Sequence, residues 1–155
     1  MALQVGSQAP DFALKSNKMA DVKLSELRGN NVLLLFVPLA FTKVCTGEFC
    51  SMRDALKDYE GLKCKVFGVS TDSPFALNAW AEKEGYNFPL LSDFNKTVAR
   101  DYQTLYDDLM GFKGVCKRSA YVIDREGKIR YAEVLDNAGN VPNFDSIKAC
   151  LTQLQ

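Results

Sequence analysis

The apolar run from Val32 to Phe41 constrains the fold of this chain more than any other segment. It is interrupted only by Pro38 and is too short to cross a bilayer as a helix, which takes about 20 residues. Within it, the stretch 31–37 is β-rich and apolar at both odd and even positions, so both faces of the predicted strand are apolar. Such a strand is covered on both sides, as in α/β domains.

The rest of the chain alternates between helix and strand patterns. After an opening segment near residues 12–14 and a connection ending at 25–27, we expect helices over 42–59, 74–84 and 96–102, strands over 65–70 and 88–91, a hairpin of strands 119–124 and 128–134, and a closing helix. Gly61 is the expected stop of the first helix, and Ser73 and Pro74 are the expected cap and first residue of the second. Gly127 is expected in the hairpin turn, and Asn143 as the cap of the closing helix. This order predicts one α/β domain over residues 1–155, with three layers and a mixed sheet.

The charge balance argues against two classes of partner. Nineteen basic residues match nineteen acidic ones, and no long block of one sign occurs, so neither nucleic acid nor a membrane surface is an expected partner. The N-terminal segment has no basic start followed by an apolar stretch and a cleavage site, so we expect a cytoplasmic protein.

The chain has no histidine and five cysteines. None of the cysteines form a Cys-x-x-Cys pair, so a structural zinc site is not expected. Catalysis by a Ser-His or Cys-His arrangement is excluded as well. A nucleophile in this chain would need activation by dipoles, hydrogen bonds or arginine.

Cys45 lies where such activation is available. It is expected in the first turn of the helix that follows the buried strand, where free backbone N–H groups and the helix dipole favour an anion. Thr42 can turn its hydroxyl toward the sulfur, and Pro38 shapes the loop between strand and helix. Position alone, however, is more typical of a small buried cysteine than of a nucleophile.

The spacing Pro38-x-x-x-Thr42-x-x-Cys45 resembles the active-site signature of the peroxiredoxins, and it lies where that family places it. The segment around Arg118 resembles the family's arginine strand, and Trp80 with its helix is also similar to the family pattern. The resemblance covers essentially the whole chain. It implies a thioredoxin-like three-layer α/β fold with a mixed central sheet and an N-terminal extension.

The resemblance also implies a reaction. Cys45 would attack the terminal oxygen of hydrogen peroxide or an organic hydroperoxide, form a sulfenic acid and release water or an alcohol. Arg118 would hold the thiolate and the peroxide oxygens, Thr42 would bond the substrate, Pro38 would shield the pocket, and the backbone N–H of Cys45 would complete the set. No metal or other cofactor is implied.

Two further residues near this motif each allow two interpretations. Glu48 matches a position that is often acidic or polar in relatives and would bond Arg118, or it is a helix-surface glutamate favoured by the dipole. Phe41 either packs over the pocket or is an ordinary core phenylalanine. The sequence leaves both choices open.

Cys50 is either a resolving cysteine or a helix-packing residue, and Cys116, two residues before Arg118, is a weaker candidate for the resolving role. The spacing Cys45-x-x-x-x-Cys50 resembles the subgroup related to the bacterioferritin comigratory protein, in which the second cysteine attacks the sulfenic acid. The whole sequence looks closer to the alkyl hydroperoxide reductase E type, whose members often use one cysteine. Residues five apart on a helix are about 7.5 Å apart along its axis and about 140° apart around it. A disulfide therefore requires unwinding, which Gly47 makes less costly.

Two other functions fit the same fold. A thiol–disulfide exchange protein or redox sensor would use a reactive cysteine, but the chain lacks the Cys-x-x-Cys pair. A non-catalytic interaction module would leave the signature unexplained. For the peroxidase, the resemblance implies a hydroperoxide substrate, a thiol reductant (thioredoxin, glutaredoxin or a small thiol) and a homodimer.

Overall fold

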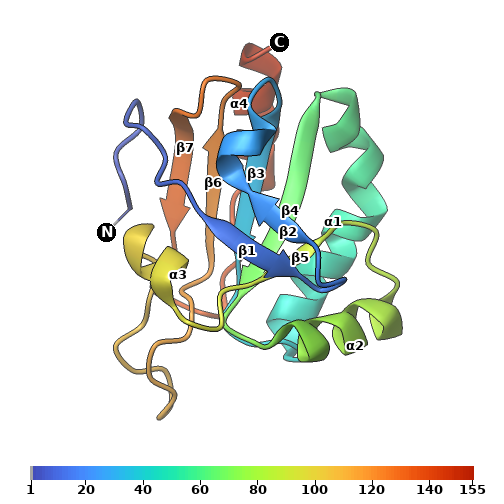
Figure 1. Cartoon of the computed structure of the whole chain (residues 1–155), viewed down its shortest axis with the longest axis vertical. Coiled ribbons are helices and arrows are strands. Elements are labelled where there is room, and N and C mark those ends of the chain that lie inside the picture. The colour runs from blue at the N-terminus through green and yellow to red at the C-terminus, as the bar shows by residue number, and fades with distance from the viewer. Residues whose placement is uncertain (1) are drawn as a thin grey trace.

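The computed structural model describes residues 2–155 and contains one mixed sheet of seven strands in the order β2-β1-β5-β4-β3-β6-β7 (Figure 1). The strands are β1 (Ala13–Ser16), β2 (Asp21–Lys23), β3 (Asn31–Phe36), β4 (Cys64–Ser70), β5 (Leu90–Ser92), β6 (Ser119–Ile123) and β7 (Ile129–Val134). The helices are η1 (Leu24–Leu27, a 3-10 helix), α1 (Lys43–Gly61), α2 (Pro74–Glu84), α3 (Thr97–Asp101) and α4 (Phe144–Gln153). β3, β4 and β5 run parallel, and the strands that flank them are antiparallel. The predicted mixed sheet is confirmed.

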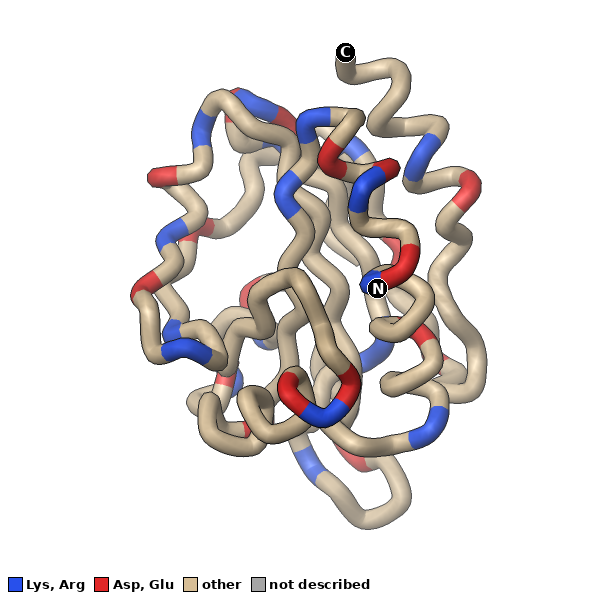
Figure 2. Tube along the Cα trace, turned by 90° about the vertical axis from the view of Figure 1, so that its right-hand side faces the viewer, with Lys and Arg blue, Asp and Glu red and all other residues tan. Residues whose placement is uncertain are grey.

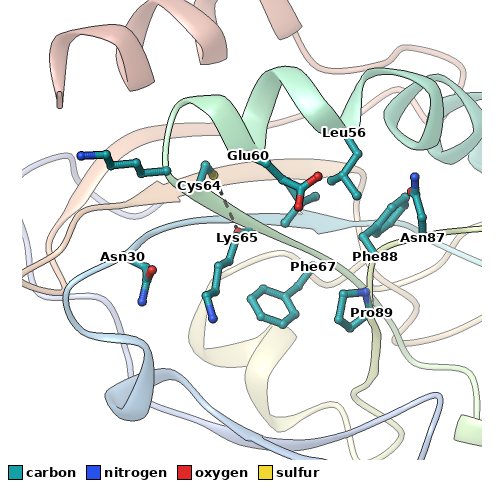
Figure 3. Close-up of a pocket in the computed structure, with 11 residues that line it drawn as sticks. Asn30, Leu56, Glu60, Cys64, Lys65, Phe67, Asn87, Phe88 and Pro89 are labelled. Carbon is teal, nitrogen blue, oxygen red and sulfur yellow. Dashed lines mark hydrogen bonds between the residues drawn. The ribbon is translucent and has the colours of Figure 1, made fainter.

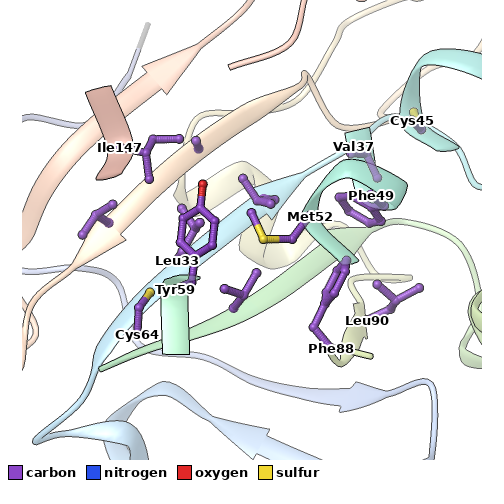
Figure 4. Close-up of a cluster of buried hydrophobic side chains, with 14 of the residues drawn as sticks. Leu33, Val37, Cys45, Phe49, Met52, Tyr59, Cys64, Phe88, Leu90 and Ile147 are labelled. Carbon is purple, nitrogen blue, oxygen red and sulfur yellow. The ribbon is translucent and has the colours of Figure 1, made fainter. Parts of the chain in front are cut away.

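β3 is buried over its whole length because both faces of the sheet are covered. On one face, Leu33 belongs to a cluster with Phe49 of α1 and Ile147 of α4 (Figure 4). On the other face, Leu34 belongs to a cluster with Val98 of α3 and with side chains of the N-terminal segment and η1. The apolar character of both strand faces is therefore explained by three layers.

Three of the predicted signals at element ends are present. The Ser73 side chain accepts a hydrogen bond from the Ala76 N–H, with Pro74 in the first helical position. Asn143 caps α4 in the same way, accepting from Ser146 N–H. Gly127 has a φ of 87° in the β6–β7 turn, a conformation that a residue with a side chain rarely adopts.

The other element ends differ from the prediction. α1 ends at Gly61, but Gly61 is its last helical residue and not a left-handed residue that stops it. The N–H groups of Leu62 and Lys63 bond to Tyr59 and Glu60 carbonyls, so the turn tightens past Gly61 and Lys63 takes the left-handed conformation, with a φ of 56°. The strand predicted over 88–91 is found slightly later in the sequence, as β5 (Leu90–Ser92). The opening segment is a β1–β2 hairpin whose exposed second strand has no strong apolar pattern.

The start of α1, which contains Cys45, lies at one end of the sheet. The segments that follow β3, β4 and β5 leave the sheet at the same end, because those strands are parallel. The segment before β6 and the one after β7 reach that end too, since Ser119 pairs with Phe36 and with Val134. This end of the sheet is the lower one in Figure 1.

Charges of both signs are interspersed along the chain, as Figure 2 shows for one side of the molecule. Within residues 2–155, no helix has the length and apolar character needed to cross a membrane. The same residues contain no group of three His, Cys, Asp or Glu side chains arranged to hold a metal ion.

Candidate active site

Cys45 is the third residue of α1 and is almost completely buried, with 1% of its surface exposed. Thr42 is the N-cap residue, and the first helical hydrogen bond runs from Thr46 N–H to the Thr42 carbonyl at 2.9 Å. The N–H groups before Thr46, including that of Cys45, have no partner within the helix. The sulfur thus lies at the positive end of the helix dipole, as predicted.

The loop before Cys45 turns sharply. Pro38 is buried two residues after the end of β3. Phe41 adopts a left-handed conformation with a φ of 67°, which is uncommon for a residue other than glycine. Phe41 is 49% exposed, and its ring lies 6.2 Å from the Trp80 ring with Lys83 Nζ 5.9 Å above it. Phe41 is therefore not a core phenylalanine but a surface side chain beside α2.

Arg118 reaches Cys45 from the start of β6. Its Nη2 donates to Cys45 Sγ at 3.3 Å, its Nη1 donates to Glu48 Oε1 at 3.0 Å, and its Nε and Nη2 donate to the Ala138 carbonyl at 3.3 and 3.1 Å. The side chain is 1% exposed. Burial lowers the pKa of Arg118, but the neighbouring Cys45 and Glu48 outweigh it and raise the pKa overall. Arg118 is thus a fixed cation with both partners in the site, not a surface arginine beside a strand.

Glu48 is buried one turn after Cys45, so the interpretation as a helix-surface glutamate is wrong. Its Oε1 forms the ion pair with Arg118, whereas its Oε2 has no hydrogen-bond partner among the described residues. Burial raises the pKa of Glu48 to about 7, against the opposing effect of Arg118, and Glu133 adds a smaller increase. The carboxyl group lies beside Arg118, which precedes β6 and is held in turn by the Ala138 carbonyl.

The side chains of Thr42 and Cys50 make their hydrogen bonds with groups other than Cys45. The Thr42 hydroxyl donates to the Leu39 carbonyl at 2.7 Å, and no hydrogen bond joins it to Cys45 within residues 2–155. Cys50 Sγ lies 3.6 Å from Glu84 Oε1 and 3.9 Å from the Tyr86 hydroxyl oxygen. Cys50 therefore faces the end of α2, in agreement with the rotation expected for two residues five apart on a helix.

The remaining cysteines lie in less reactive surroundings. Burial raises the pKa of Cys64 to about 12 and that of Cys116 well above its usual value. Cys150, which is half-buried on α4, also has a pKa raised by burial. Since the thiolate is the reactive form, these three thiols are poor nucleophiles.

Asp72 is a residue of the site that the sequence did not point to. Its Oδ2 accepts a hydrogen bond from the Ala40 N–H at 2.8 Å and another from the Ser70 hydroxyl, while its carbonyl accepts from the Ser92 hydroxyl at 2.6 Å. Asp72 thereby ties the loop before Cys45 to the ends of β4 and β5. The available signal was its place directly after a buried parallel strand, at the same sheet end as Cys45.

If Cys45 reacts with peroxide as the resemblance implies, replacing Asp72 by alanine is expected to slow that reaction by about 10- to 100-fold, because small displacements of a reacting group carry costs of this size. Asp72→Asn keeps a carbonyl oxygen for the Ala40 N–H and should retain most of the rate. Stopped-flow measurement of both variants tests this. An Asp72→Ala rate equal to that of the wild type would show that Ala40 is held by the rest of the loop.

One cavity lies away from Cys45. It has a volume of about 520 Å³ and is lined by residues that include Glu60, Cys64 and Phe88, beside the beginning of β4 (Figure 3). Since β4 leads from this cavity toward the sheet end that carries Cys45, the cavity is separate from the candidate site.

Proteins similar to this chain define its class. The chain is 39% identical over 135 residues to alkyl hydroperoxide reductase E of Mycobacterium tuberculosis, covering 85% of this chain and 86% of that protein. It is 38% identical over 143 residues to peroxiredoxin-2 of Mus musculus, covering 86% of this chain and 70% of that protein. The crystal structure of peroxidoxin BcpB from M. tuberculosis matches 99% of both chains with a TM-score of 0.87 at 29% identity.

These similarities and the fold define a thiol-dependent peroxidase with a thioredoxin-like fold and an N-terminal extension. The model of the AhpC/TSA family matches residues 5–132, and the chain belongs to that family. The resemblance drawn from the signature is confirmed. The comparisons do not favour a disulfide-exchange protein, a redox sensor or a non-catalytic module.

Proposed function

We propose that Cys45 is the residue that attacks the hydroperoxide. The observation that carries this proposal is the buried contact between Cys45 Sγ and Arg118 Nη2 at 3.3 Å, made at a helix start. The sulfur electron pair forms a bond to the terminal peroxide oxygen, the O–O bond breaks, and the leaving oxygen departs as water or an alcohol after taking up a proton.

The surrounding groups have supporting roles in this proposal. Arg118 and the N–H of Cys45 stabilise the charge as it moves from sulfur to the leaving oxygen. The Thr42 hydroxyl oxygen, whose proton is directed to Leu39, is free to accept a bond from the peroxide O–H. Pro38, which is buried in the loop before Cys45, restricts access of water to the sulfur. The substrates are hydrogen peroxide and organic hydroperoxides.

Stopped-flow mixing of the reduced protein with hydrogen peroxide tests this role, followed through Trp80, the one tryptophan of the chain. Trp80 Nε1 donates to the Thr46 hydroxyl at 3.2 Å, so its fluorescence reports on the first turns of α1. We expect a fast phase in the wild type and in Cys150→Ser, and none in Cys45→Ser. A wild type that reacts no faster than a free thiol would refute the role of Cys45.

We propose that Cys50 resolves the sulfenic acid after the first turns of α1 unwind. Its half-buried position and Gly47 within the intervening turn support this assignment. A thiol reductant of a reducing cytoplasm (thioredoxin, glutaredoxin or a small thiol) would then restore both cysteines. Peptide mapping after one equivalent of peroxide tests it: a sulfenic acid at Cys45 beside a reduced Cys50 would exclude Cys50.

We further propose that residues 1–155 act as one domain and that two copies associate through the sheet end that carries Cys45. Most of the large exposed apolar side chains belong to segments at this end. They are Phe41, Phe75, Phe94, Met110, Phe112 and Val141, while Val5 and Met19 lie elsewhere. Such an apolar patch is typical of an interaction surface. Sedimentation of the wild type and Phe75→Glu tests the homodimer.

A further inference from the structure

The buried site has one cation for two groups that can become anions. Arg118 donates to Cys45 Sγ and to Glu48 Oε1, and its remaining contacts go to the Ala138 carbonyl. If Cys45 and Glu48 were both ionised, the site would carry a net negative charge in a region where all three side chains are at most 3% exposed. An uncompensated buried charge is strongly unfavourable.

The second oxygen of Glu48 shows where a proton can reside. Glu48 Oε2 is buried and has no hydrogen-bond partner among residues 2–155, which is costly for an ionised carboxylate. The charged groups that act on Glu48 are Arg118 before β6 and Glu133 on β7, and Cys45, one turn earlier on α1, shares Arg118 with it. Only Arg118 favours the ionised form. Burial and Glu133 favour the protonated form, and they raise the pKa of Glu48 to about 7.

We propose that Cys45 and Glu48 share one proton across Arg118, so that Glu48 is protonated while Cys45 is a thiolate and ionises when Cys45 is oxidised. This inference rests on the proposed role of Cys45. Interacting groups of this kind titrate as a pair. Glu48 contacts Arg118 rather than the sulfur, so it acts as a positioning residue that sets the charge of the site.

The reaction then balances without a change in the net charge of the site. The Cys45 thiolate forms its bond to the terminal oxygen, the O–O bond breaks, and the leaving alkoxide or hydroxide needs one proton. Glu48 releases one proton as the thiolate charge disappears, directly or through solvent. Before the reaction Arg118 is balanced by the thiolate, and afterwards it is balanced by the Glu48 carboxylate.

Proton uptake during oxidation tests this proposal. The reduced protein is brought to the lowest pH at which the ultraviolet absorbance shows Cys45 fully ionised, and one equivalent of hydrogen peroxide is added in weak buffer with a pH indicator. We expect the wild type and Glu133→Gln to take up almost no protons, and Glu48→Gln to take up about one proton per Cys45 oxidised. Uptake of about one proton by the wild type would overturn the proposal.

Two measurements keep the result unambiguous. Mass spectrometry of the same samples gives the amount of oxidised Cys45. A lack of oxidation refutes the proposed function, whereas oxidation with full proton uptake refutes only the shared proton. If Glu48→Gln does not fold, the infrared difference spectrum of the wild type suffices. Oxidation should remove a protonated-carboxyl band that shifts in D2O, and an unchanged carboxyl region would contradict the proposal.

Discussion

Replacing Arg118 by alanine is expected to slow the reaction of Cys45 with hydrogen peroxide by about 10²- to 10³-fold, the loss typical when one preorganised donor to a developing charge is removed. Arg118 is the one side chain that donates to Cys45 Sγ within residues 2–155. Its effect is large because the site is buried, where charge interactions are screened less than in water. Stopped-flow traces of Trp80 fluorescence measure the rate.

Arg118→Lys is the matched control for charge. A lysine keeps the positive charge but cannot donate to Cys45, Glu48 and the Ala138 carbonyl in the fixed geometry of a guanidinium. We expect its rate to lie between those of the wild type and Arg118→Ala. Thermal unfolding of each variant separates lost catalysis from lost structure. A wild-type rate in a folded Arg118→Ala protein would remove Arg118 from the mechanism.

The features that sequence predicted correctly depend on local patterns. β3 was predictable because its two apolar faces require cover on both sides, and α2 because Ser73 and Pro74 mark its start. The placement of Cys45 at the start of α1 followed from the change of periodicity after Pro38. Arg118 lies 73 residues from Cys45 in sequence, so its place in the site came from the family resemblance and not from spacing.

The features that sequence did not determine depend on tertiary packing. Glu48 is on the same side of α1 as Cys45, but its buried ion pair is made with Arg118, which lies 70 residues away in the sequence. Phe41 belongs to an apolar run yet is half exposed, because its left-handed backbone turns it outward. The bond from Ala40 to Asp72 joins residues 32 apart. No local pattern encodes which of two neighbouring loops will supply the acceptor.

The stability of the wild type is expected to fall as the pH rises from about 4.5 to about 7, by about 3 kcal/mol through Glu48. In this interval the folded protein holds the Glu48 proton and the unfolded chain has released it. Folding therefore takes up a proton, and the stabilisation that is complete below pH 4.5 is lost as the pH passes through the folded pKa of about 7.

Chemical denaturation of the wild type and Glu48→Gln at a series of pH values isolates this contribution, because the difference between the two curves cancels groups that both proteins share. Asp93, whose pKa is also raised by burial, is one such group. The glutamine variant lacks the titrating carboxyl, so its stability relative to the wild type should rise across the interval. Glu133→Gln should follow the wild type, since Glu133 makes only a minor contribution to the pKa of Glu48. Parallel curves for wild type and Glu48→Gln would mean that folding does not raise the pKa of Glu48. A carboxyl group that ionises beside Arg118 as readily as in the unfolded chain could not hold the proton that Cys45 gives up.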